Sequence, residues 1–181
     1  MKRALIVYIS IAGNTEKVAK SIDRGLAEGG FSTVLRTVQE AADEDFYAYD
    51  LVCFGAPSYN WHVPKAADEF LKAKFSQYKK EGRIIPGAPE LPGKRYLVFC
   101  TYSGPHTGIR EAIPAGKYIG QFFEHFGFAV ADEWYVLSEF TGSEENSTLG
   151  RMGNIKGLPS ENDLERIKSS AHNLALRLQS Y

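Results

Sequence analysis

The chain has 181 residues, of which 44% are hydrophobic and 13% aromatic, and this length and composition suit one domain over residues 1–181 with a sizeable core. The formal net charge of −1, without a long basic run, argues against a broad nucleic-acid-binding surface. No apolar stretch is long enough for a membrane span, and the two cysteines, Cys53 and Cys100, lack a metal-binding spacing, so we expect a cytoplasmic protein with reduced cysteines and no metal site.

The first predicted element is a buried strand, Ala4–Ile9, and a helical pattern over Thr15–Glu28 follows it after a short turn. Gly29 and Gly30 end this helix. Further strands are predicted at Phe31–Val38, Leu51–Ala56, Tyr96–Tyr102 and Phe128–Leu137, and further helices at Val38–Asp43 (a short one), Pro64–Lys80, Pro114–Phe126 and Asn162–Gln179.

The first, third and fourth strands are apolar almost throughout, a pattern typical of strands that are buried on both faces of a parallel sheet. Strands alternate with helices along the chain, as they do when helices cover both faces of such a sheet. The sequence therefore predicts an α/β fold with a doubly wound, five-stranded parallel sheet.

Two segments lack a periodic pattern. Ile85–Gly93, with three prolines and two glycines, is predicted to be a loop. The segment from about 139 to 159 is long for a loop in a compact domain, and both a functional loop and a plain solvated connection fit it.

The turn after the first strand is predicted to bind an anion through Ser10, Ala12, Gly13, Asn14 and Thr15. The N-terminus of the following helix offers unpaired backbone N–H groups and the positive end of the helix dipole, and the turn adds hydroxyl donors. We therefore expect a phosphate group at this turn.

A second turn at residues 57–62 and a third turn at residues 101–108 are expected beside it. They follow the third and fourth strands, and ligands of doubly wound sheets sit at the carboxyl ends of the strands. A flat heteroaromatic ring needs side chains over its faces, for which Tyr59, Trp61 and Tyr102 are suited, and backbone N–H groups at its edges. A ring here and a phosphate at residues 10–15 together describe flavin mononucleotide (FMN). The ring site would be formed by Pro57, Ser58, Tyr59, Asn60, Trp61, Thr101, Tyr102, Ser103, Gly104 and His106.

These three turns resemble the cofactor loops of the flavodoxin-like proteins. Residues 10–15 are similar to the family's phosphate loop, Thr/Ser-x-Thr-Gly-x-Thr, and depart from it at Ala12, where a hydroxyl is usual. Gly55–Tyr59 resembles the second loop and Ser103–Gly108 the third, whose Gly and His residues lean toward the quinone reductases of this fold. The resemblance implies the strand order 2-1-3-4-5 and bound FMN.

The resemblance implies two functions. The first, which we favour slightly, is an electron carrier that serves a redox partner protein, although carriers of this family are commonly more acidic than this chain. The second is an NAD(P)H-dependent quinone or flavin reductase, whose wider pocket would be shared across a homo-oligomer. Arg110 and Glu111 follow the third turn and could reach a substrate, but a solvated helix edge is the position that we expect for them.

Overall fold

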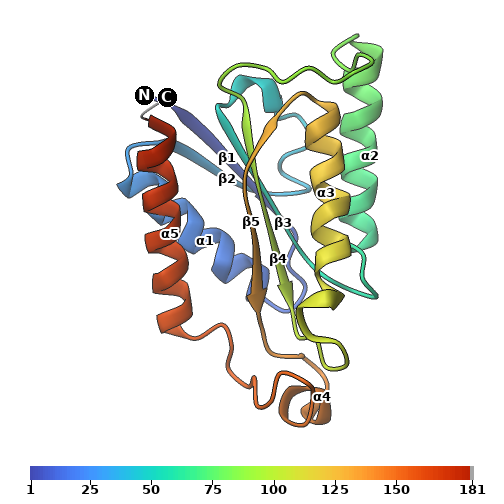
Figure 1. Cartoon of the computed structure of the whole chain (residues 1–181), viewed down its shortest axis with the longest axis vertical. Helices are drawn as coiled ribbons and strands as arrows, with labels where there is room; N and C mark the ends of the chain where they lie inside the picture. Colours follow the sequence, from blue (N-terminus) through green and yellow to red (C-terminus); the bar gives the residue numbers. More distant parts are fainter. Residues whose placement is uncertain (180–181) are drawn as a thin grey trace.

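The sheet of this protein has five parallel strands in the order β2-β1-β3-β4-β5, as the resemblance implies (Figure 1). The structure is a computed structural model that describes residues 1–179. The strands are β1 (Arg3–Tyr8), β2 (Ser32–Thr37), β3 (Leu51–Pro57), β4 (Arg95–Tyr102) and β5 (Ala129–Leu137).

Helices cover both faces of the sheet (Figure 1). The helices α1 (Asn14–Glu28) and α5 (Glu161–Gln179) pack on one face, and α2 (Lys65–Lys80) and α3 (Ile113–His125) pack on the other. Strands β1, β3 and β4 are buried along almost their whole length, as their apolar sequences predict. None of the helices within residues 1–179 is long and apolar enough to cross a membrane.

The predicted cysteine environment is confirmed, because Cys53 and Cys100 are both free and fully buried. They lie in the apolar clusters on opposite faces of the sheet. Burial raises the pKa of both thiols, so they remain protonated at neutral pH.

Three details differ from the sequence analysis. The short helix predicted at Val38–Asp43 is wrong, because these residues form turns, and a 3₁₀ helix follows at Phe46–Ala48. Pro64 lies one position before α2 as its N-cap instead of opening the helix. The segment 139–159 is not wholly irregular, because it contains the short helix α4 (Glu144–Thr148).

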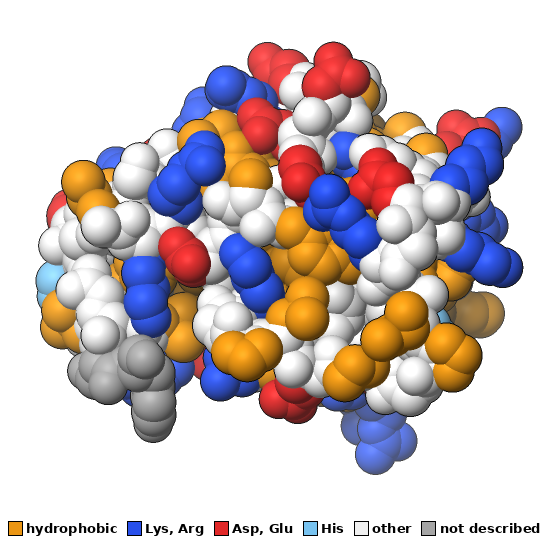
Figure 2. Space-filling model, turned by 90° about the horizontal axis from the view of Figure 1, so that it is seen from above, with side chains coloured by type: hydrophobic (Ala, Val, Ile, Leu, Met, Phe, Trp, Pro, Cys, Tyr) orange, Lys and Arg blue, Asp and Glu red, His pale blue; other side chains and the backbone are white. Residues whose placement is uncertain are grey.

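The architecture brings the carboxyl ends of all five strands to one end of the molecule, where α4 also lies (Figure 1). Figure 2 views the opposite end, where acidic and basic side chains are interspersed. The turns that the sequence assigns to a cofactor all follow carboxyl ends, so the fold places them together.

Candidate functional site

A cavity of about 470 Å³ opens at the carboxyl ends of β1, β3, β4 and β5, and its size is typical of small-molecule sites. The structure brings all three predicted turns into its wall, and of the residues assigned from sequence only Gly13 does not line it. The predicted residues that line the cavity are Ser10, Ala12, Asn14, Thr15, Pro57, Ser58, Tyr59, Asn60, Trp61, Thr101, Tyr102, Ser103, Gly104 and His106.

The first turn leaves polar groups unpaired where the sequence predicts a phosphate. Gly13 is the N-cap of α1 and has a left-handed backbone with φ of 88°, which favours glycine. None of the side chains that the structure describes caps this helix end. The Ser10 Oγ is buried and has no hydrogen-bond partner within residues 1–179. A buried hydroxyl without a partner costs about 1–3 kcal/mol, so this turn fits an anion that would accept its hydrogen bond.

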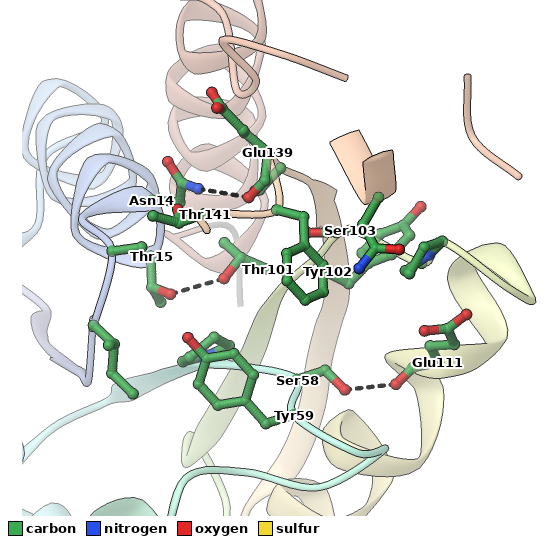
Figure 3. Close-up of a pocket in the computed structure, with 18 of the residues that line it drawn as sticks. Asn14, Thr15, Ser58, Tyr59, Thr101, Tyr102, Ser103, Glu111, Glu139 and Thr141 are labelled. Carbon is green, nitrogen blue, oxygen red and sulfur yellow. Dashed lines mark hydrogen bonds between the residues drawn. The ribbon is translucent and has the colours of Figure 1, made fainter. Parts of the chain in front are cut away.

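A buried hydrogen bond connects the first turn to the third. The hydroxyls of Thr15 and Thr101 lie 2.8 Å apart and join the first turn of α1 to the end of β4 (Figure 3). Both residues are buried, with 1% and 3% of their surface exposed. This bond fixes the spacing between the predicted phosphate site and the predicted ring site.

The second turn is a two-residue hairpin. The backbones of Tyr59 and His62 exchange two hydrogen bonds of 2.8 and 3.0 Å. The central residues, Asn60 and Trp61, have φ of 48° and 65°, as in a type I′ turn. Asn tolerates this conformation, whereas a bulky residue such as Trp pays about 1–2 kcal/mol for it. Trp61 therefore holds a strained position at the mouth of the cavity, with 62% of its surface exposed.

Replacing Trp61 by glycine is expected to raise the free energy of unfolding of the ligand-free protein by about 1 kcal/mol, because glycine adopts the left-handed conformation freely. In a protein of this size that change raises the melting temperature by about 2–4 °C. Thermal unfolding followed by circular dichroism measures the change. Asn60→Gly is the matched control and should move the melting temperature less; a lower melting temperature for Trp61→Gly would show that the indole contributes more by packing than its backbone costs.

The third turn depends on a glycine. Gly104 has φ of 55°, and its carbonyl accepts a 3.0 Å hydrogen bond from the N–H of Gly108. A Cβ atom on Gly104 would lie 2.6 Å from the Gly108 carbonyl oxygen, so no larger residue fits this tight turn. The turn thereby brings Ser103 and Gly104 into the cavity wall.

Glu111 corrects the sequence analysis, which placed it at a solvated helix edge. It lines the cavity, and its Oε1 accepts hydrogen bonds from the backbone N–H groups of His106, at 2.9 Å, and Thr107, at 2.5 Å. Its carbonyl oxygen accepts a 2.5 Å hydrogen bond from the Ser58 hydroxyl, which connects the second turn to the third (Figure 3).

The cavity has a fourth wall, formed by Ser138, Glu139, Phe140, Thr141 and Asn146. The sequence left a functional role open for the segment 139–159, but no site residue was assigned to this wall. Ligands of doubly wound sheets bind at the carboxyl ends of the strands, and these residues follow the carboxyl end of β5. The same reasoning that placed the other three turns therefore applies to this wall. The side-chain amide of Asn14 donates to the Glu139 carbonyl at 3.4 Å, and the Glu139 carboxylate, which accepts from the N–H of Gly157, points away from the cavity (Figure 3).

The polar groups of the cavity are mostly uncharged. None of the described residues that line it is Lys or Arg. Its two acidic lining residues, Glu111 and Glu139, both accept backbone N–H groups through their carboxylates, and the carboxylate of Glu139 points away from the cavity (Figure 3). Burial raises the pKa of Tyr102, so its phenol stays neutral and able to donate. An anion bound here would be held by hydroxyls, backbone N–H groups and the N-terminus of α1.

Comparison with known proteins agrees with this architecture. The family model described as flavodoxin matches residues 6–167. A protein from Archaeoglobus fulgidus named NAD(P)H dehydrogenase (quinone) is 24% identical over 93% of both chains. A flavodoxin from Clostridium saccharobutylicum is 27% identical over 71% of this chain and 82% of its own. The solved flavodoxin of Streptococcus pneumoniae TIGR4 has the same fold, with a TM-score of 0.65 and 19% identity over 97% of this chain and 99% of its own.

Proposed function

Because the chain belongs to the flavodoxin family and shares its redox function, we propose that it binds FMN in the cavity and transfers electrons between redox partners. The observation that carries this proposal is the buried Ser10 Oγ, which has no hydrogen-bond partner among the described residues and lies in the turn that leads into α1. A phosphate at this position would satisfy the hydroxyl and would face the positive end of the helix dipole.

The phosphate end of FMN would be held by Ser10, Thr15 and the backbone N–H groups of the first turn of α1. Thr15 already shares a hydrogen bond with Thr101, so its orientation is fixed before a ligand arrives. Ala12 supplies only its backbone N–H, which leaves Ser10 with a larger share of the side-chain contacts.

The ring end would lie between the second and third turns. Tyr59 and Trp61 are the exposed aromatic residues of the second turn, and the buried Tyr102 lies at the end of β4. FMN, when bound, supplies the one- and two-electron chemistry, and the chain's residues bind and orient it and shield part of it from water. The exposed aromatic rim leaves one side open for a partner, as a carrier requires.

A second candidate, an NAD(P)H-dependent quinone reductase, is favoured by the fourth wall. Phe140, Thr141 and Asn146 extend the cavity beyond the three cofactor turns, and Phe140 remains 37% exposed. The name of the Archaeoglobus fulgidus relative points in the same direction. Such an enzyme would hold a nicotinamide nucleotide and a quinone at this wall in turn.

Anaerobic spectroscopy tests both candidates. Protein reconstituted with FMN should show the visible absorption of bound flavin. A carrier should then exchange electrons with dithionite and ferricyanide but oxidise NADH and NADPH negligibly in the presence of a quinone. Rapid quinone-dependent oxidation of either nucleotide would select the reductase, whereas an apoprotein that leaves the FMN spectrum and fluorescence unchanged would contradict both.

A further inference from the structure

Among residues 1–179, Glu111 is the single side chain that accepts two hydrogen bonds from the backbone of the third turn. Its Oε1 accepts from the N–H groups of His106 and Thr107, at 2.9 and 2.5 Å, and lies 3.4 Å from the Thr107 hydroxyl. Its backbone carbonyl accepts from the Ser58 hydroxyl at 2.5 Å. One residue therefore holds the third turn in place and ties it to the second turn, on the side where both line the cavity (Figure 3).

We propose that Glu111 is a positioning residue that holds the third turn ready to bind the isoalloxazine ring; this inference rests on the proposed binding of FMN. Glu111 acts through the backbone of the turn. It fixes the N–H groups of His106 and Thr107, and these two groups are therefore occupied before the ligand binds.

The remaining donors of the turn support this role. Within residues 1–179, the N–H groups of Ser103 and Gly104 have no hydrogen-bond partner, and both residues line the cavity. They are the donors that the turn can offer to the edge of a polar ring. Because the Gly104 carbonyl accepts from the N–H of Gly108, the geometry of these donors depends on the same tight turn that Glu111 holds.

The contacts around Glu111 indicate why its loss would affect binding more than stability. His106 and Thr107 are exposed, so their N–H groups would bond to water if the carboxylate were absent. The backbone N–H of Arg151 donates to the Pro105 carbonyl at 2.7 Å and would still hold the start of the turn. Without Glu111 the turn would sample other conformations, and the ligand would have to order it on binding.

The test compares Glu111→Ala, Glu111→Gln and Glu90→Ala. Glu111→Gln removes the negative charge but retains an amide oxygen, which can accept hydrogen bonds from the two N–H groups. Glu90→Ala is the matched control, since it makes the same change in charge at an exposed residue of the loop at the opposite end of the sheet. Amide hydrogen exchange at His106 and Thr107 in the ligand-free proteins reports on the turn, and titrations with FMN and with riboflavin report on binding.

Glu111→Ala should speed exchange at both amides by about tenfold and weaken both ligands by about tenfold, the equivalent of about 1.4 kcal/mol. The ratio of the riboflavin and FMN dissociation constants should not change, because both ligands carry the same ring. Glu111→Gln should restore most of the affinity, and Glu90→Ala should behave as the unaltered protein. Rescue by Gln distinguishes positioning from a general loss of folding, which the melting temperatures measure.

The inference fails if Glu111→Ala leaves both dissociation constants unchanged, or if it weakens FMN alone. In either case the unaltered protein would still bind FMN, and the proposed function would stand. If the unaltered protein binds neither FMN nor riboflavin, the proposed function fails and the positioning role falls with it.

Discussion

Replacing Ser10 by alanine is expected to weaken FMN binding by about thirtyfold while making the ligand-free protein slightly more stable. The Ser10 Oγ is buried and has no hydrogen-bond partner in the described part of the chain, so alanine removes an unsatisfied polar atom from the apoprotein. In the complex the same hydroxyl would donate to a charged phosphate, a bond of about 2 kcal/mol. Fluorescence titration measures the affinity, and thermal unfolding measures the stability.

Riboflavin is the internal control for this variant, because it lacks the phosphate and should bind Ser10→Ala as it binds the unaltered protein. Ser169→Ala, an exposed serine of α5, should change neither measurement. An equal loss of affinity for FMN and riboflavin would place Ser10 beside the ring and contradict the assignment of the phosphate.

Replacing Gly13 by valine is expected to weaken FMN binding by about a hundredfold and to lower the stability of the ligand-free protein. Gly13 has φ of 88°, and no described residue beyond its two chain neighbours places an atom within 4 Å of the position of a Cβ atom there. The penalty therefore comes from the backbone, where a left-handed conformation costs about 1–2 kcal/mol for an ordinary residue and more for a β-branched one. The turn would relax and withdraw N–H groups from the phosphate, which accounts for the rest of the loss.

Gly13→Asn is the matched variant, because asparagine tolerates the left-handed conformation and the site has room for its side chain. It should retain most of the FMN affinity that Gly13→Val loses. Similar losses for the two variants would show that the side chain itself blocks the ligand, and that backbone strain is not the cause.

Much of the fold could be predicted from the sequence because its signals are local. The apolar runs of β1, β3 and β4 differ clearly from an alternating pattern, and each predicted strand lies within two residues of the observed one. Ser160 and Asp163 have the spacing of a capping box at the start of α5, and each of these side chains accepts a hydrogen bond from the backbone N–H of the other. The three turns that are predicted to hold a cofactor could be placed because each follows a strand in a fold with a known site edge.

Other features depend on contacts that sequence periodicity does not report. Residues 38–43 favour a helix by composition, yet a segment so short does not repay the cost of helix nucleation, and Glu40 instead bonds back to Thr37. The five residues of α4 are all polar, and its start is marked only by the Ser143 cap. The contacts of Glu111 were not predicted, because its carboxylate accepts hydrogen bonds from backbone N–H groups four and five residues earlier. Backbone groups of this kind do not appear in a list of chemical motifs.

The proposed function requires that the cavity binds FMN with the phosphate at residues 10–15. The most direct test compares the dissociation constants of FMN and riboflavin for the unaltered protein under the same conditions. Because at least two hydrogen bonds to a charged group are at stake, each of about 1.5–3 kcal/mol, FMN should bind at least about a hundredfold more tightly. Equal affinity for the two ligands would contradict the account.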